Sequence, residues 1–194
     1  MRVIRDFVEK PNEHALWGEQ VHTAFEYRML NGTPLPEGMQ QWEPIASKLA
    51  SIKGEKFCEH KFAIDSSFAP VPYKEAWSRG IADLFVLDKT KAGVFDYKTG
   101  KRKPSAQLSL YAGYIFSHYP EVETVATGFV WLKEKKLTKE VFTRENVATI
   151  WQYFLPTVRK LEDAHANDKW PARPSGLCKG WCAVTSCVHN QKAK

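Results

Sequence analysis

Long apolar runs are missing from this sequence, and no stretch approaches the roughly 18 residues that a membrane span requires. A membrane-embedded protein is therefore not expected. The start of the chain, Met1–Glu9, also lacks the form of a signal peptide, because charges come too early and too often. These absences predict a cytoplasmic protein, in a bacterium or in a phage-infected host cell.

Cysteine is scarce as well, with 4 in 194 residues, so a disulfide scaffold is not expected in a reducing compartment. Three of the cysteines, Cys178, Cys182 and Cys187, fall close together and are followed by His189. Such a set could hold a structural zinc ion, or supply three of the four ligands of an iron–sulfur cluster. The gaps differ from the two-residue gap of common zinc knuckles, so inert thiols remain an alternative.

Acidic residues are outnumbered by basic ones, which gives the chain a formal net charge of +6. That balance suits a polyanionic partner such as nucleic acid. With 43% hydrophobic residues, the chain is too apolar to be mainly disordered. Its length allows one buried core and no second ordinary domain. We expect one domain over residues 1–166 and an extension, residues 167–194, packed on it.

Two apolar segments in the middle of the chain, Ile81–Asp88 and Ala92–Thr99, predict a β-hairpin, because they are rich in Val, Ile, Phe and Tyr. The polar stretch Asp88–Gly93 between them has the composition of a turn. Further strands are expected at 56–64, 122–132 and 137–142, and helices at 13–30, 44–52, 104–118 and 145–166, the last kinked or divided at Pro156.

Charged side chains stand at the centre of this apolar hairpin. An antiparallel register centred on the turn puts Asp83 roughly opposite Asp96. Because side chains alternate along a strand, Asp96 and Lys98 project from one face and Tyr97 from the other. Buried charges are costly unless they are paired or bound to a metal, so the hairpin is a candidate functional site.

Other residues could extend this cluster, each with a plainer alternative. His22 lies one turn before Glu26 on the first helix and could reach a metal at the hairpin, or simply pair with that glutamate. In strand 56–64, alternation puts Cys58 and His60 on one side and Glu59 on the other. Glu59 could border the acidic cluster or face solvent beside Lys61.

A basic turn follows the hairpin directly, with Lys101, Arg102 and Lys103 in succession. It is either a solvated loop or a set of phosphate contacts, and its position beside the acidic cluster favours phosphate contacts. The next helix carries Gln107 and, four residues later, Tyr111. A core tyrosine and an exposed glutamine are the plain interpretation of that pair, but the first turns of this helix should lie near the hairpin.

The order of these elements and motifs resembles the PD-(D/E)XK nuclease superfamily, in particular its RecB-type branch, which includes phage exonucleases. The resemblance covers Gly18 to Phe142. The motifs that carry it are Gly18-x-x-x-His22, Gly80-Ile-Ala-Asp83, Asp96-Tyr-Lys98 and Gln107-x-x-x-Tyr111. It implies an α/β fold with a restriction-endonuclease-like core, in which helices flank a mixed central β-sheet, here with a Cys-containing C-terminal extension.

The resemblance also implies a metal site. Asp83 and Asp96 would hold Mg²⁺ or Mn²⁺, with the backbone carbonyl of Tyr97 and the side chain of His22 as further ligands. Hard oxygen ligands suit these metals, and a histidine shifts the balance toward Mn²⁺. Many relatives have Glu where this chain has Asp96, and the shorter side chain could move the metal slightly.

The remaining motif residues would act on the substrate. Lys98 would orient or help deprotonate the attacking water, and Gln107 and Tyr111 would position the DNA strand. Some members of the superfamily hold a 4Fe-4S cluster with one upstream and three C-terminal cysteines. Here the upstream cysteine, Cys58, follows the His22 helix instead of preceding it, so zinc on the C-terminal cysteines and His189 is a serious competitor.

The expected function is therefore a metal-dependent DNA exonuclease of repair, recombination or phage DNA metabolism, with a recombination or replication protein as a candidate partner. One alternative is a catalytically silent scaffold of the same fold that binds DNA or a helicase. Another is a structural domain in which the two aspartates merely form a buried ion pair with Lys98.

Overall fold

The computed structural model describes residues 13–103, 105–182 and 184–191. Two compact units are distinguished, one spanning Glu13–Tyr153 and one containing Phe154 onward. The division falls inside the last long helix, α4 (Val147–Ala166), and the predicted boundary after residue 166 falls at the end of that helix. The buried residues of α4, Ile150 and Trp151, both lie in its first turns, which explains why the core unit ends there.

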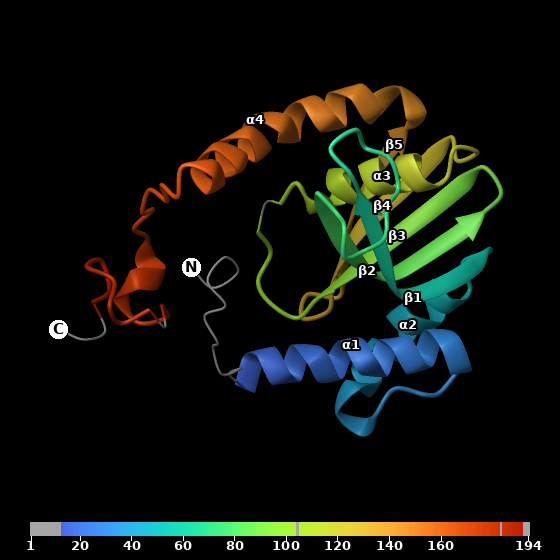
Figure 1. Cartoon of the computed structure of the whole chain (residues 1–194). Helices are drawn as coiled ribbons and strands as arrows, with labels where there is room; N and C mark the ends of the chain where they lie inside the picture. The colour runs from blue at the N-terminus through green and yellow to red at the C-terminus, as the bar shows by residue number, and fades with distance from the viewer. Residues whose placement is uncertain (1–12, 104, 183, 192–194) are drawn as a thin grey trace. The chain divides into compact units, whose positions relative to one another are not determined.

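A five-stranded sheet forms the centre of the first unit, with the strands in chain order across it (Figure 1). Neighbouring strands pair antiparallel except β3 and β4, which are parallel, so the sheet is mixed as predicted. The parallel pair requires a crossover connection, which α3 (Gln107–His118) supplies. The strands are β1 (Glu55–Ile64), β2 (Ser78–Asp88), β3 (Lys91–Lys98), β4 (Thr124–Trp131) and β5 (Lys136–Thr143).

One face of the sheet is packed against the N-terminal helices. These are α1 (Glu13–Asn31), the 3-10 helix η1 (Glu37–Trp42) and α2 (Glu43–Ala50). Alternate residues of the strands contribute to this core, because side chains on a strand point to opposite faces in turn. The buried cluster on this face includes Val21, Phe25, Met29, Leu84, Val86, Phe95, Tyr97 and Val130.

The other face is covered by α3, which is buried along almost its whole length (Figure 1). A helix that is apolar all round needs contacts on both sides. The first turns of α4 supply the second contact, because a Cβ on Gly113 would come within 2.8 Å of the Trp151 ring. Trp151 also stacks on Phe68, with ring centroids 4.5 Å apart, and so holds the loop that follows β1.

Several predicted boundaries differ from the structure. The helix after the basic turn begins at Gln107, whereas its predicted start at Pro104 lies outside the described residues. α4 is a single helix with Pro156 inside it, so this proline does not divide the helix, and the alternative of a kink stays a prediction. The segment between the first two predicted helices contains η1, and α2 begins at Glu43, one residue before its predicted start.

The alternation predicted for β1 is also wrong. Cys58 packs in the cluster beneath α1, while the His60 ring lies 5.0 Å from Phe85 on the α3 side. The reason is Glu59, which has a φ of 48° and so adopts a left-handed conformation within the strand. A single residue in this conformation interrupts the two-residue period of the strand.

The second unit contains the end of α4, a 3-10 helix η3 (Gly176–Lys179) and the cysteine-rich segment. The buried Asn190 holds this segment together, because its side-chain amide donates to the carbonyls of Cys182 and Val184, at 3.0 and 2.9 Å. The backbone N–H of Gln191 donates to the carbonyl of Cys178. All four cysteines of the chain lie among the described residues and are free thiols.

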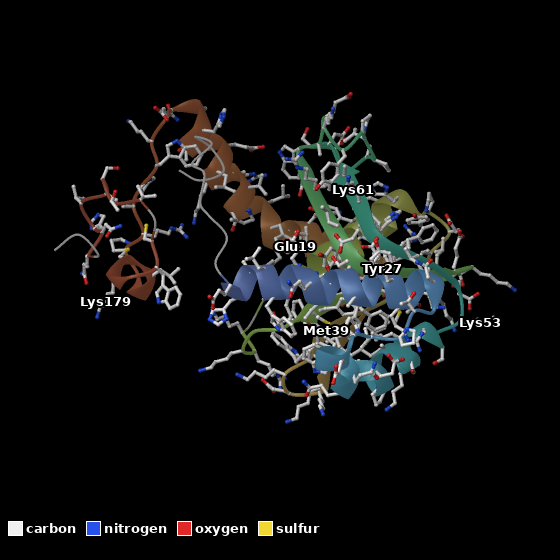
Figure 2. All side chains as sticks on the ribbon, turned by 90° about the horizontal axis from the view of Figure 1, so that it is seen from below. Glu19, Tyr27, Met39, Lys53, Lys61 and Lys179 are labelled. Atoms are coloured by element: carbon white, nitrogen blue, oxygen red, sulfur yellow. The ribbon has the colours of Figure 1, made fainter. Side chains whose placement is uncertain are left out.

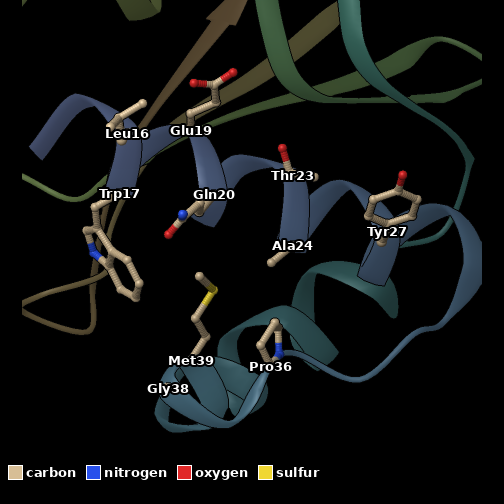
Figure 3. Close-up of a pocket in the computed structure, with 10 residues that line it drawn as sticks. All are labelled: Leu16, Trp17, Glu19, Gln20, Thr23, Ala24, Tyr27, Pro36, Gly38 and Met39. Carbon is tan, nitrogen blue, oxygen red and sulfur yellow. The ribbon is translucent and has the colours of Figure 1, made fainter. Parts of the chain in front are cut away.

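A pocket of about 700 Å³ lies between α1 and η1, with Trp17, Thr23 and Met39 among its lining residues (Figure 3). Glu19 and Tyr27 mark the same helix in Figure 2. The lining includes none of the predicted site residues, so the pocket is separate from the candidate site. None of the described helices is long and apolar enough to cross a membrane.

His60 on β1 and His118 at the end of α3 give the fold a predicted sensitivity to acid. Burial lowers the pKa of both His60 and His118, and the positive charge of His118 lowers that of His60 further. The folded state therefore favours the neutral rings, and this stability is present above the unfolded pKa, near 6.5, and lost as the pH falls through the folded values. These two rings should therefore lower the Tm as the pH falls from 7 to 5.

The test is a set of melting curves over this pH range for the wild type and the double variant His60→Asn/His118→Gln. The double variant should lose less of its Tm on acidification than the wild type. Substituting the exposed His14 with glutamine is the matched control. Equal slopes for the wild type and the double variant would contradict the prediction.

Candidate active site

Strands β2 and β3 part at the position of the two aspartates. Their paired residues run from Asp88 and Lys91 down to Leu84 and Phe95, the register that the sequence predicted. One step further, the backbone N–H of Tyr97 donates to Asp83 Oδ2 at 2.6 Å. A carboxylate thus takes the place of a backbone acceptor, and Asp83 and Asp96 line the opening between the strands.

His22 on α1 bridges two of the predicted metal ligands. Its Nδ1 lies 3.3 Å from Asp83 Oδ1, and its Nε2 lies 3.0 Å from the carbonyl oxygen of Tyr97. Both partners are acceptors, so the doubly protonated ring satisfies both. The hydrogen bond to Asp83 accordingly raises the pKa of His22, against the opposing effect of burial. A doubly protonated ring would put positive charge where the resemblance expects a cation.

Asp96 is held by two neighbours from the same region. The side-chain amide of Gln107 donates to Oδ1 at 2.7 Å. The Lys98 ammonium forms an ion pair with Oδ2 at 2.6 Å. Gln107 also accepts from Lys98 at 3.2 Å. Lys98, Asp96 and Gln107 therefore form one polar network, as the predicted faces of β3 require.

The first turn of α3 extends this network to β2. The Gln107 amide donates to the Tyr111 hydroxyl at 3.0 Å, and that hydroxyl donates to the carbonyl of Ile81 at 2.5 Å. Gln107 is thus not simply exposed, and Tyr111 is both a core residue and a hydrogen-bond partner of the site. These hydrogen bonds connect Asp96 on β3 with Ile81 on β2, across the opening between the two strands.

Asp96 lies in an environment that disfavours its negative charge. It is 3% exposed, and burial together with the charge of Asp83 raises the pKa of its carboxyl, although Lys98 acts in the opposite direction. A buried carboxylate next to another negative charge is stabilised by a further cation, in addition to Lys98. This is the electrostatic character expected of a metal ligand.

Glu59 is the residue that the sequence left undecided. Its carboxylate, the His22 ring and Asp83 have ligand atoms that all lie within 4.8 Å of one another. Burial and the charge of Asp83 raise the pKa of Glu59. The pairing of β1 with β2 could have identified this residue. Cys58 pairs with Leu84, so Glu59 lies beside Asp83.

These residues fit a divalent cation by the chemistry of their donors. Three carboxylates, one imidazole and the Tyr97 carbonyl offer mainly hard oxygen ligands, which Mg²⁺ and Mn²⁺ prefer. Asp96 is buried and is repelled by the negative charge of Asp83. A bound cation would offset both unfavourable effects. Among the described residues, the group of His22, Glu59 and Asp83 is the one set of three with ligand atoms this close.

The C-terminal cysteines are not gathered in the same way. Cys178, Cys182, Cys187 and His189 all lie among the described residues, yet no three of them have ligand atoms within 4.8 Å of one another. Burial also raises the pKa of the upstream Cys58 thiol to about 11, so this residue is a protonated core thiol. A zinc or iron–sulfur site in the extension stays a prediction.

The basic turn after β3 lies at the surface, with Lys101, Arg102 and Lys103 all exposed. Arg102 donates to the Thr138 hydroxyl at 3.4 Å and lies 3.8 Å from the Glu134 carboxylate. These contacts turn its guanidinium toward β5. The loop is therefore tied to the sheet beside Lys98, and its lysines are open to solvent.

Comparison with known proteins shows the family to which the chain belongs. A sequence profile of the PD-(D/E)XK nuclease superfamily matches residues 2–187. The chain belongs to this superfamily. The restriction-endonuclease-like core expected from the sequence is thereby confirmed. No curated protein shows a significant match to the chain.

Solved structures with a similar arrangement have very different sequences. The crystal structure of SSO0001 is 14% identical, with a TM-score of 0.42, and the match covers 92% of this chain and 72% of the other. An exonuclease candidate from Eubacterium rectale is 10% identical, with a TM-score of 0.45, over 95% of this chain and 85% of the other. PD-(D/E)XK nucleases typically use divalent metal ions, and the group of His22, Glu59 and Asp83 is a site that could hold one.

Proposed function

We propose that this PD-(D/E)XK nuclease is a Mg²⁺- or Mn²⁺-dependent deoxyribonuclease that removes nucleotides from DNA ends. The observation that carries the proposal is the opening between β2 and β3, where Asp83, Asp96 and Lys98 meet at the end of a paired ladder. Action from ends is supported by the RecB-type motifs, which include His22 on α1 and Gln107 with Tyr111 on α3.

We assign the binding of the metal to one group of these residues. Asp83, Asp96, the Tyr97 carbonyl and His22 would hold the metal, with Glu59 beside them. When bound, a divalent cation lowers the pKa of a coordinated water and stabilises charge on the phosphate in the transition state. His22 must release a proton to become a ligand, because both of its ring nitrogens now face acceptors.

Lys98 would act on the water and the phosphate. Its ammonium is half-buried and held by Asp96 and the Gln107 carbonyl oxygen, so its position is fixed before substrate arrives. A preorganised cation stabilises developing negative charge without reorganisation. Gln107 orients the lysine and Asp96 at once, which makes it a positioning residue for the network.

The test is digestion of DNA labelled at either the 5′ or the 3′ end, single- and double-stranded, with Mg²⁺, with Mn²⁺ and with EDTA. We expect metal-dependent release of short products from ends and no cleavage of a closed circular duplex. Cleavage of the circle would show an endonuclease instead. Binding of DNA without cleavage in any metal would support the silent scaffold over the enzyme.

A further inference from the structure

The sheet surface that carries the candidate active site continues onto β4. In the parallel pairing of β3 and β4, Asp96 lies beside Phe129 and Lys98 beside Trp131. Residues paired across a ladder share a face of the sheet. The Lys98 ammonium accordingly lies 5.1 Å from the centre of the Phe129 ring. Two aromatic rings therefore extend the floor of the site away from the aspartates.

A pocket of about 310 Å³ lies over this aromatic floor. The basic turn forms one wall, and β5 forms the other. Its lining residues are Arg102, Lys103, Ser105, Phe129, Trp131, Thr138 and Glu140. Binding sites for small ligands are typically about 300–1,000 Å³, so the pocket has room for one small ligand unit and not for a duplex.

The pocket is built from fixed parts. Phe129 and Trp131 are 3% and 5% exposed, and their rings pack with centroids 5.4 Å apart. The indole N–H of Trp131 donates to the Thr138 hydroxyl at 2.8 Å, and the same hydroxyl accepts from Arg102 at 3.4 Å. The guanidinium is thus held over the floor by the residue that orients the indole.

Charge is distributed unevenly across the pocket. Arg102 and Lys103 make the loop side positive, and Glu140 makes the far side negative. A phosphate is attracted to the first side and repelled by the second, whereas amino groups of a base can donate to a carboxylate. The ligand that matches this pattern has an anionic end, a flat aromatic body and hydrogen-bond donors.

We propose that this pocket binds the single nucleotide next to the phosphate that is cleaved. Its backbone phosphate contacts Arg102 and Lys103, and its base lies against Phe129 and Trp131 with the amino edge toward Glu140. The inference rests on the proposed function, since it takes the scissile phosphate to lie at Lys98. It implies that the strand enters the site unpaired at this nucleotide, because the pocket has no room for the opposing base.

The test is binding of a fluorescently labelled pentadeoxycytidylate, whose bases carry an amino group, measured by anisotropy in Ca²⁺ and in EDTA, so that cleavage is not needed for the readout. The double variant Arg102→Ala/Lys103→Ala should weaken binding by roughly tenfold or more, as expected for loss of charge-assisted hydrogen bonds. The matched control is Lys139→Ala, which removes a lysine between Thr138 and Glu140 that lines a pocket with Phe95 and Leu137 instead.

A second variant tests the base. Trp131→Phe keeps an aromatic ring in the floor but removes the hydrogen bond to Thr138. It should weaken binding of the pentadeoxycytidylate severalfold and leave binding of an abasic pentamer with the same phosphates unchanged, whereas the Arg102/Lys103 variant should weaken both. Circular dichroism and Tm confirm that each variant is folded.

Three outcomes would overturn the subsite. They are unchanged affinity in the double variant, an equal loss in Lys139→Ala, and an equal loss of the abasic pentamer in Trp131→Phe. Failure of the proposed function shows elsewhere, as lack of cleavage of both DNA and bis(4-nitrophenyl) phosphate by the wild type in Mg²⁺ and Mn²⁺. The proposed subsite can therefore be refuted while the proposed nuclease activity stands, and the reverse also holds.

Discussion

Substituting Asp96 with asparagine is expected to lower metal-dependent DNA cleavage by roughly 10³-fold or more, since it removes one ligand charge and the partner of Lys98. The substitution keeps the size of the side chain and its contact with Gln107. The loss therefore reports on charge at the opening between β2 and β3 and not on packing. The measurement is the initial rate of release of labelled nucleotides in Mg²⁺ and in Mn²⁺.

Lys98→Ala should produce a loss of similar size, because the ammonium is held in place before substrate arrives. The matched control for both variants is Asp88→Asn, which changes an aspartate on β2 next to the hairpin turn, away from the site. Cleavage by either site variant at the wild-type rate would refute the site assignment. A comparable loss in Asp88→Asn would indicate damage to the hairpin instead.

Mg²⁺ and Mn²⁺ are expected to raise the Tm of the wild-type protein by several degrees. A ligand at about 100 times its Kd stabilises the folded state by about 2.7 kcal/mol, and each kcal/mol corresponds to about 2–4 °C in a chain of this size. The expected shift is therefore roughly 5–10 °C. Asp83→Asn and Asp96→Asn should abolish it, and Glu59→Gln should reduce it if that carboxylate belongs to the site.

The same variants should behave differently without metal. Because burial and Asp83 raise the pKa of Asp96, the folded state carries this charge at a cost, and Asp96→Asn should melt at or above the wild-type Tm in EDTA. A lower Tm in EDTA would mean that the contact with Lys98 outweighs the repulsion. A metal-dependent shift that survives in both aspartate variants would place the cation elsewhere.

Local patterns allowed the hairpin to be predicted from the sequence. The turn between Asp88 and Lys91 fixed the register, and the register placed Asp83 and Asp96 together. Alternation then put Lys98 on the correct face. Each of these steps depends on residues close together in the chain, where the spacing of strand side chains leaves few alternatives.

The contribution of Glu59 could not be predicted in the same way. Its left-handed backbone conformation interrupts the alternation of β1, and nothing in the local sequence requires a non-glycine residue to adopt it. The place of His60 was missed for the same reason. The contacts of Gln107 were underestimated because they depend on where α3 begins relative to β3, which is a tertiary property.

The candidate active site is assembled from five separate segments, on α1, β1, β2, β3 and α3. The contact between His22 and Tyr97 spans 75 residues, whereas the β2–β3 hairpin closes over a short turn. Contacts that are distant in sequence form slowly, because the entropy of closing long loops must be overcome first. A growing or half-folded chain can therefore have the hairpin and its aspartates without a complete centre, and nuclease activity would be the last property that this protein acquires as it folds.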